Sequence, residues 1–156
     1  MKKNEEEDDD IQINQYKIVV LGDGSVGKTS FILRFIEDSF QMSYKQTIGV
    51  DFFCRRLELS KNVVAAMNVW DIGGQSIFGK MIPTYLTQAN AIIFLYDITN
   101  YQSFIDISDW VELAKKSASS SGNSVLNVLV GNKCDLAHMQ AVNVNKHIDV
   151  FSDKVR

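Results

Sequence analysis

The run GDGSVGKT at residues 22–29 has the spacing of a phosphate-binding loop, in which two glycines with four residues between them are followed by lysine and then serine or threonine. Glycines let the backbone turn so that several N–H groups point at phosphate oxygens, and the start of a helix adds partial positive charge there. Lys28 would reach the outer phosphates, and the hydroxyl of Thr29 would ligate Mg²⁺. The run therefore predicts a site for a phosphorylated ligand and Mg²⁺.

A second motif, DIGGQ, occupies residues 71–75. The carboxylate of Asp71 can hold Mg²⁺ through water, as the second acidic element of nucleotide hydrolases does. Gly74 can offer a backbone N–H to a terminal phosphate, and Gln75 can orient an attacking water. An aspartate at a strand end indicates only a turn when it stands alone, so this interpretation depends on the phosphate-binding loop elsewhere in the chain.

A third motif, NKCD at residues 132–135, has the chemistry of guanine recognition. The carboxylate of Asp135 can accept hydrogen bonds from N1–H and the exocyclic amino group of guanine, whereas adenine would leave that carboxylate unpaired. Asn132 can bind N7 and the loop backbone, and the stem of Lys133 can lie over the base. By itself this tetrapeptide is common on surfaces, so its position after a buried strand carries the interpretation.

The elements that must position these motifs alternate between strands and helices along the chain. Expected strands cover residues 16–21, 51–59, 63–70, 91–96 and 125–130, and expected helices cover 28–37, part of 72–86, 103–116 and, more weakly, 144–155. A short turn makes strands 51–59 and 63–70 an antiparallel hairpin. Pro83 weakens the helix in which it lies or marks its irregular part. Residues 117–124, rich in serine, are expected to form a surface loop.

This order predicts an α/β fold with a mostly parallel sheet, one antiparallel hairpin and helices on both faces, the three-layer sandwich of P-loop NTPases. Ligands of such sheets bind at the carboxyl ends of the strands. All three motifs directly follow an expected strand, so we expect them to meet at one edge of the sheet.

Composition and charge limit the alternatives. The chain has 156 residues and a net charge of −3, which suits one domain and gives no basic surface for nucleic acid. Cys54 and Cys134 fit no disulfide or metal spacing, and they suit a reducing cytoplasm. The N-terminus is acidic and unlike a signal peptide, and no apolar run is long enough to span a bilayer.

Residues 1–14 carry a block of like charges and are expected to be a disordered acidic tail, leaving residues 15–156 as the folded domain. The tail could bind a basic partner, although a solvated leader is the commoner use of such a block.

Over roughly residues 15–151 the chain resembles the Ras-like small GTPases, and among them the Rab family. The three motifs and Thr47 stand in the family's order and at similar spacing, and the runs YKQTIGVDFF at 44–53, WDIGGQ at 70–75 and YDITNYQSF at 96–104 resemble family segments. Ile-Gly at 72–73 matches a divergent branch of that family, where most members have Thr-Ala.

The resemblance implies a GTP/GDP-binding switch that hydrolyses GTP with Mg²⁺ and serves vesicle traffic. It implies that Thr47 binds Mg²⁺ and the terminal phosphate in the GTP state and that Phe40 stacks on the edge of the guanine. With the motif residues above, the expected metal ligands are Thr29, Thr47 and Asp71, and the expected catalytic residues are Gln75, Lys28 and Thr47. The expected nucleotide contacts are Gly22, Asp23, Gly24, Ser25, Val26, Gly27, Lys28, Thr29, Ser30, Phe40, Tyr44, Thr47, Gly74, Asn132, Lys133 and Asp135.

Partners implied by the resemblance are effectors, exchange factors and GTPase-activating proteins, which would bind the switches at 44–53 and 71–86. The family works in the cytoplasm and attaches to membranes peripherally through lipidated C-terminal cysteines, and this sequence carries no such cysteine near Arg156. In the family a further strand and a final helix would follow, and we expect residues 15–156 to be a truncated small GTPase domain that lacks both. Without them, strand 125–130 would be an apolar edge, and we expect a marginally folded protein that self-associates and binds GTP weakly.

No arginine lies between Phe40 and Thr47, so that loop supplies no arginine finger in cis. Intrinsic hydrolysis is expected to be slow, on the order of 10⁻⁴ to 10⁻³ per second. Two other functions fit part of the sequence. One is a binding module with little turnover that sequesters partners, and the other is a P-loop kinase, against which the guanine motif and Gln75 argue.

Overall fold

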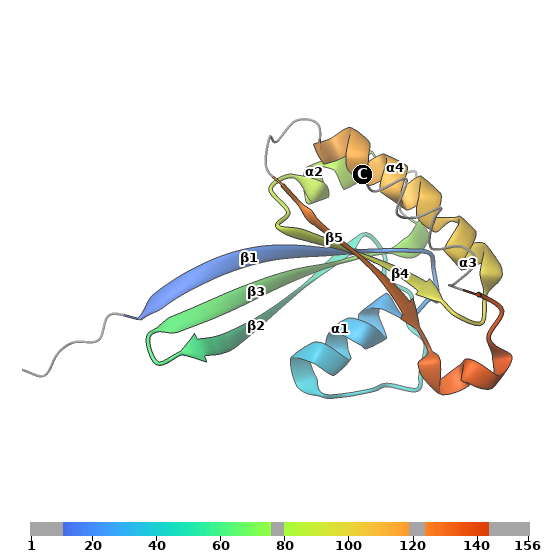
Figure 1. Cartoon of the computed structure of the whole chain (residues 1–156), viewed down its shortest axis with the longest axis horizontal. Coiled ribbons are helices and arrows are strands. Elements are labelled where there is room, and N and C mark those ends of the chain that lie inside the picture. The colour runs from blue at the N-terminus through green and yellow to red at the C-terminus, as the bar shows by residue number, and fades with distance from the viewer. Residues whose placement is uncertain (1–10, 76–79, 119–123, 144–156) are drawn as a thin grey trace, which may run out of the picture.

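The computed structural model describes residues 11–75, 80–118 and 124–143. Strands and helices alternate through these residues, as the sequence predicts (Figure 1). The elements are β1 (Gln12–Leu21), α1 (Lys28–Glu37), β2 (Val50–Ser60), β3 (Val63–Ile72), α2 (Ile82–Leu86), β4 (Ala91–Asp97), α3 (Tyr101–Ile105), α4 (Ile107–Ala118), β5 (Leu126–Asn132) and a 3₁₀ segment, η2 (Cys134–Met139). The order confirms the α/β class.

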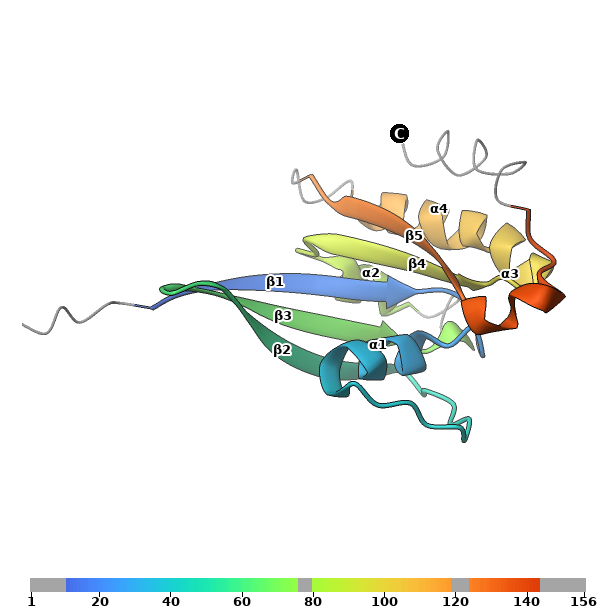
Figure 2. The same ribbon diagram turned by 60° about the horizontal axis from the view of Figure 1, so that its bottom comes forward.

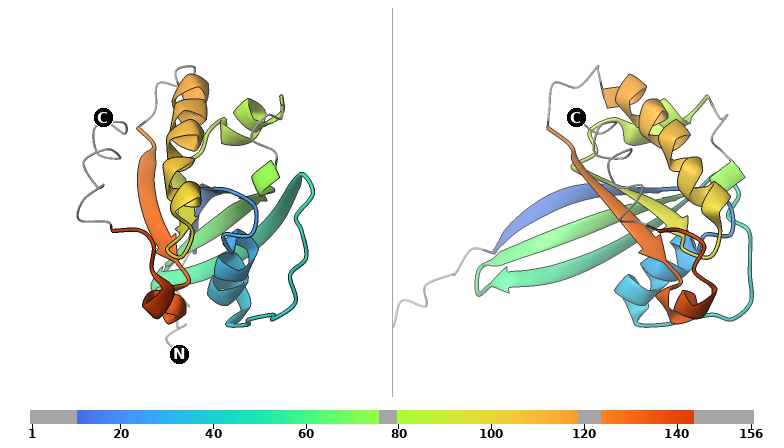
Figure 3. Two further views of the ribbon diagram at one scale, coloured as in Figure 1. Left: turned by 90° about the vertical axis from the view of Figure 1, so that its right-hand side faces the viewer. Right: turned by 45° about the vertical axis from the view of Figure 1, so that its right-hand side comes forward.

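The strands form one sheet in the order β2-β3-β1-β4-β5. The β2–β3 pair is antiparallel, and the β1–β3, β1–β4 and β4–β5 pairs are parallel, which confirms the mostly parallel sheet with one hairpin. Helix α1 lies on one face, and α2, α3 and α4 lie on the other (Figure 2). The turned views in Figure 3 show the same three layers.

Each face of the sheet has its own apolar core. Toward α1, the core residues include Ile18, Val20, Ile32, Val69 and Leu95. Toward α2, α3 and α4 they include Val19, Leu21, Phe94, Phe104 and Trp110. Successive residues of β1 contribute to the two cores in turn, because successive side chains of a strand point to opposite sides of the sheet. Burial on both faces explains why the central strands β1 and β4 are apolar where they pair with each other.

Strand β1 begins earlier than expected. Gln12 pairs with Val63 of β3, and its backbone N–H donates to the carbonyl of Asn62 at 2.8 Å. The expected tail boundary at residue 14 is therefore wrong for residues 12–14, because ladder hydrogen bonds to β3 hold this polar segment in the sheet. Residues 1–10 of the expected tail lie outside the described residues.

One of the expected helices is divided, and the place of Pro83 in another is now defined. The helix expected over 103–116 is two helices, α3 and α4, that meet at Asp106. Asp106 stays close to helical, with φ −67° and ψ −15°, so the break is a short irregularity in a continuous apolar pattern. In α2, Pro83 lies in the first turn, where its missing N–H leaves no hydrogen bond broken.

The expected edge strand is confirmed among the described strands, since β5 pairs with β4 alone. The serine-rich loop expected at 117–124 falls largely outside the described residues, and the helix expected at 144–155 falls there entirely. No helix in the described ranges is long and apolar enough to cross a bilayer.

Candidate functional site

Residues 22–27 form the turn between the end of β1 and the start of α1, at the carboxyl end of the sheet. Gly22 has φ +144° and lies so close to β4 that a Cβ would overlap the carbonyl of Leu95. Gly27 has φ +94° and precedes the first residue of α1. Both positions therefore need glycine for conformation, and Gly22 needs it for space as well. The strand, glycine turn and helix that the motif requires are present.

Lys28, the first residue of α1, is buried, with 6% of its surface exposed. Its Nζ donates to the carbonyl oxygens of Gly22 and Asp23, each at 2.7 Å. Burial lowers the pKa of Lys28 to about 8, although the carboxylates of Asp71 and Asp23 oppose that change. The side chain is thus folded back over the loop, and its ammonium group lies where the loop could receive an anion.

Two hydroxyls and one carboxylate meet beside this lysine. Thr29 Oγ1 donates to Asp71 Oδ2 at 2.5 Å, and it lies 3.0 Å from Thr47 Oγ1. Thr47 Oγ1 lies 3.4 Å from the same carboxylate oxygen. The three residues come from α1, from the segment before β2 and from β3. The structure therefore brings together the three side chains that the sequence predicts as a metal set.

Within the described residues, the Asp71 carboxylate is buried with only one of its oxygens hydrogen-bonded. It is fully buried, and Oδ1 has no hydrogen-bond partner in the described part of the chain. Burial raises the pKa of the Asp71 carboxyl above its ordinary value, and the Thr29 hydroxyl and the Lys28 ammonium oppose the change. An unpaired buried carboxylate oxygen is costly, so a group that binds it would stabilise this arrangement.

The donor set fits Mg²⁺ better than a transition metal. No three histidine, cysteine or carboxylate side chains gather anywhere in the described ranges. Two hydroxyls and one carboxylate are hard oxygen donors, and Mg²⁺ takes few protein ligands and completes its shell with water and phosphate oxygens.

Two of the motifs begin inside a strand and not after it. Asp71 belongs to β3, where it pairs with Val20 of β1 and Asp51 of β2. Asn132 is the last residue of β5 and pairs with Asp97. The expectation that both directly follow strands is wrong by one or two residues, because the ladders continue to the edge where the site lies.

Gly74 and Gln75 differ in their relation to the loop. A Cβ at Gly74 would overlap the backbone of Asp23 and Gly24, so this segment touches the phosphate-binding loop directly. Gln75 is exposed, and the structure describes the chain only up to this residue before it resumes at Lys80. Part of the expected switch at 71–86 therefore lies outside the described residues.

The guanine motif is tied to the same loop. Asn132 Nδ2 donates to the carbonyl of Val26 at 2.8 Å. Lys133 has a left-handed backbone, with φ +66°, and its Nζ forms an ion pair with Asp97 Oδ2 at 2.7 Å. Asp135 is exposed at the start of η2. Asn132 thus fixes where the base motif stands relative to the phosphate loop.

Asp97, at the end of β4, is a residue that sequence reasoning did not assign to the site. Its Oδ1 accepts hydrogen bonds from the backbone N–H and the hydroxyl of Thr99, at 2.8 and 2.7 Å. Burial alone would raise the pKa of this carboxyl, but the hydrogen bonds from Lys133 and Thr99 outweigh burial and hold the pKa below its ordinary value. Its position at the carboxyl end of a buried strand could have indicated it.

The segment between α1 and β2 reaches the cluster through Thr47 alone among its predicted residues. Phe40 and Tyr44 are exposed, at 67% and 68% of their surface. Neither ring belongs to the two apolar cores that cover the sheet. The remaining predicted contacts, Gly24, Ser25, Val26 and Ser30, lie in the loop and the first turn of α1.

Comparisons with known proteins agree with this arrangement. The model of the Ras family matches residues 17–154. Over 140 residues the chain is 49% identical to the Ras-related protein Rab-28 of Caenorhabditis elegans, an alignment that covers 90% of this chain and 56% of the relative. Over 130 residues it is 42% identical to the GTP-binding protein YPTM1 of Zea mays, covering 83% of this chain and 61% of that protein. The chain thus spans less than two thirds of the length of these relatives.

Proposed function

Because the chain belongs to the Ras family, we propose that it is a Rab-like switch that binds GTP and GDP with Mg²⁺ and hydrolyses GTP. The observation that carries the proposal is the convergence of Lys28, Thr29 and Asp71 beside a loop to which Asn132 also binds. One end of the mostly parallel sheet thus carries a cation, hard oxygen donors and a base-recognition motif. Together these suit a nucleoside triphosphate.

Phosphate binding is assigned to the loop and to Lys28. The Lys28 ammonium, which donates to the Gly22 and Asp23 carbonyls, would turn to the outer phosphates. The backbone N–H groups of residues 22–29 and the start of α1 would receive the remaining oxygens. Desolvation by burial makes the ammonium a stronger partner for an anion than it would be in water.

Thr29, Thr47 and Asp71 would hold Mg²⁺, with Asp71 acting through water. When bound, the ion supplies charge neutralisation for the phosphates. Thr47 lies at the end of an exposed segment, so a contact between its hydroxyl and a terminal phosphate would order residues 44–53. Gly74, packed on Asp23, would do the same for residues 71–86.

Guanine is assigned to Asp135, Asn132 and Lys133. Asp135 would accept the two donors of the base, and the Lys133 stem, held by Asp97, would cover one face of it. Phe40, Tyr44 and Ser30 complete the proposed nucleotide contacts. The exposed Phe40 would order against the edge of the base.

Hydrolysis is assigned to Gln75, which would orient the attacking water, with Lys28 and Thr47 stabilising charge on the transferred phosphate. With no arginine between Phe40 and Thr47, a partner would supply a cation for fast turnover. The ordered switches would then be read by effectors in the cytoplasm at the surface of membranes, as part of vesicle traffic.

The test starts from the purified protein. Denaturing it and separating the released small molecules should yield GDP or GTP. Single-turnover measurements with GTP and Mg²⁺ should then give slow release of phosphate, and an excess of ATP should not compete. Bound guanine nucleotide without turnover would instead support the binding module, and equal competition by ATP would contradict the base assignment.

A further inference from the structure

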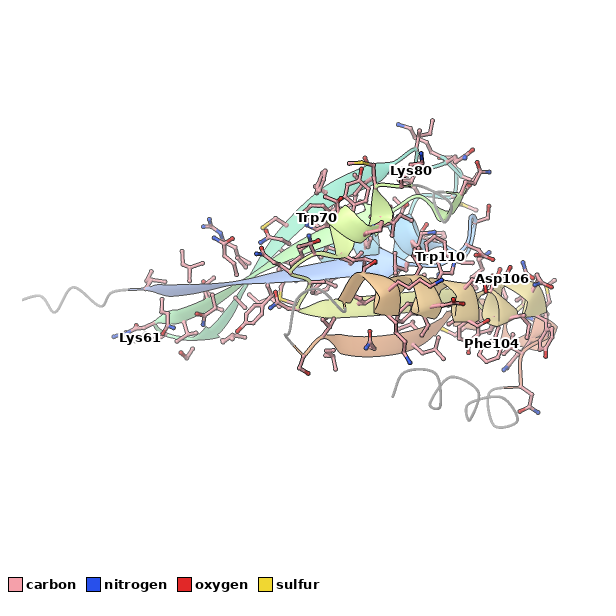
Figure 4. All side chains as sticks on the ribbon, turned by 90° about the horizontal axis from the view of Figure 1, so that it is seen from above. Lys61, Trp70, Lys80, Phe104, Asp106 and Trp110 are labelled. Atoms are coloured by element: carbon pink, nitrogen blue, oxygen red, sulfur yellow. The ribbon has the colours of Figure 1, made fainter. Side chains whose placement is uncertain are left out.

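A hydrogen bond joins helix α4 to the phosphate-binding loop. Trp110 Nε1 donates to Asp23 Oδ1 at 2.9 Å, across 87 residues of chain. Trp110 is fully buried, and it lies on the helical layer over the sheet next to the break at Asp106 (Figure 4). Sequence periodicity predicts this tryptophan as part of the apolar face of its helix, but its indole N–H has a polar partner in the site.

The residue that receives this bond is central to the loop. The carbonyl oxygen of Asp23 accepts the Lys28 ammonium at 2.7 Å. The same peptide leaves no room for a Cβ at Gly74. The orientation of the Asp23 peptide therefore sets both where the lysine is held and how closely the segment after β3 approaches the loop.

The side chain of Asp23 is held from the helical layer. Asp106 lies near the Asp23 carboxyl and itself accepts a hydrogen bond from Gln102 Nε2 at 2.7 Å. Burial raises the pKa of Asp23, the indole donor lowers it, and Asp106 raises it further. A carboxyl beside a second carboxyl and in a half-buried place needs a donor, and Trp110 supplies it.

The geometry of the helix presents the indole to the loop. The backbone N–H of Trp110 donates to the Asp106 carbonyl at 3.3 Å, across the junction of α3 and α4. Because the ring is fully enclosed by the core toward α2, α3 and α4, it has little freedom to follow a moving loop. The core thus holds the donor in place, and the hydrogen bond ties the Asp23 side chain to it.

We propose that Trp110 is a positioning residue of the phosphate-binding loop. Through its hydrogen bond to Asp23 it holds the peptide whose carbonyl accepts the Lys28 ammonium and which lies against Gly74, and it thereby slows release of bound nucleotide. This inference rests on the proposed function. It adds helix α4, which carries none of the sequence motifs, to the groups that determine how tightly phosphate is held.

The test measures release of N-methylanthraniloyl-GDP from the full chain in Mg²⁺. Trp110→Phe keeps an aromatic ring and removes the donor, and we expect release to become about tenfold faster, the size of one lost hydrogen bond to a charged group. Asp23→Ala should have a similar effect. The double variant should be no faster than the faster single variant, because both changes remove the same interaction. Asp23→Asn keeps an acceptor for the indole and should release nucleotide more slowly than Asp23→Ala.

Val111→Ala is the matched control. Val111 is the next residue of the same helix and is buried, and its side chain has no hydrogen-bond donor. This change should lower the melting temperature of the protein through a cavity while it leaves the rate of nucleotide release within about twofold of the parent. A role of Trp110 in core packing alone would predict that Val111→Ala and Trp110→Phe speed release in proportion to their loss of stability.

Parental release from Trp110→Phe, or additive effects in the double variant, would overturn the inference. If Trp110→Phe does not fold, the pair Asp23→Ala and Asp23→Asn decides, since equal release from both would show that no donor acts on this side chain. A parental protein that does not bind the labelled GDP would instead contradict the proposed function.

Discussion

The phosphate side of the site and the side that would meet the base and terminal phosphate differ in how completely they are formed. Lys28 and Asp71 are buried. Lys28 donates a hydrogen bond to the loop carbonyl of Asp23, and Asp71 accepts one from the Thr29 hydroxyl. Phe40, Gln75 and Asp135 are exposed. The groups proposed to bind phosphate and Mg²⁺ are therefore buried and bonded within the fold, and the groups proposed to meet the base and the attacking water face solvent.

This difference follows from the free-energy cost of leaving each kind of group without a partner. A buried charge without partners is strongly unfavourable, so Lys28 and Asp71 must be paired in any folded state. An exposed aromatic or carboxylate has no such requirement, and ordering it costs conformational entropy that only a ligand can offset. One side is thus set by folding and the other by binding.

The largest expected effect comes from breaking the formed side. Lys28→Ala removes the buried ammonium, and we expect GDP and GTP affinity to fall by about a thousandfold, because charge-assisted hydrogen bonds to phosphate are lost in a desolvated place. Equilibrium titration with labelled GDP measures it. Lys116→Ala changes the same charge at an exposed ion pair with Glu112 and should leave the affinity unchanged. Parental affinity in Lys28→Ala would remove this lysine from the site.

The next effect sharpens the exposed side. Asp135→Asn should weaken GDP binding by about a hundredfold and strengthen binding of the xanthine nucleotide, since an amide presents a donor where xanthine has a carbonyl. Because the side chain is exposed, the melting temperature without nucleotide should not change. Competition of the two nucleotides measures the preference, and a variant that still prefers guanine would show that another residue reads the base.

Gln75→Leu separates catalysis from both kinds of binding. The leucine has a similar size but cannot orient water, so hydrolysis stimulated by an activating protein should fall by about a hundredfold while GTP affinity changes little. Phosphate release in a single turnover measures the rate. Turnover at the parental stimulated rate would place the water-orienting group elsewhere.

The smallest expected effect lies where the two sides meet. Asp97→Asn weakens the hold on Lys133, and we expect GDP affinity to fall by about tenfold. Because the pKa of Asp97 is held below its ordinary value, its contribution is fully present above that ordinary value, about 4, and is lost only as the pH falls through the lower pKa of the folded state. The ratio of affinities of parent and variant should therefore be the same at pH 6 and pH 8.

Asp109→Asn, an exposed change on α4, is the control for that measurement. A ratio that changes between pH 6 and pH 8 would mean that Asp97 titrates in that range and that the ion pair does not hold Lys133 as described.

The sequence allowed the loop and its flanking strand and helix to be predicted, because they depend on local spacing. The meeting of Thr29 and Asp71 follows from the rule that parallel strands end at one edge, whereas Thr47 was placed beside them by the family resemblance alone. The sequence did not indicate the bonds from Asp97 to Lys133 or from Trp110 to Asp23. These depend on which side chains face each other across the fold, and a tryptophan with helical spacing has the same pattern whether or not its N–H is used. The early start of β1 was also missed, since Gln12 and Asn14 have weak strand propensity and are held by β3.

The place of β1 in the sheet has a consequence for synthesis of the chain. Among the described strands β1 is made before the others, and its neighbours are β3, whose Asp71 pairs with Val20, and β4, whose Phe94 pairs with Leu21. Residues 18–21 are apolar, and they have no strand to pair with until β3, the third described strand, has left the ribosome. Of the described strands, the one that leads into the phosphate-binding loop therefore waits longest for a partner, and a chaperone would be expected to hold it.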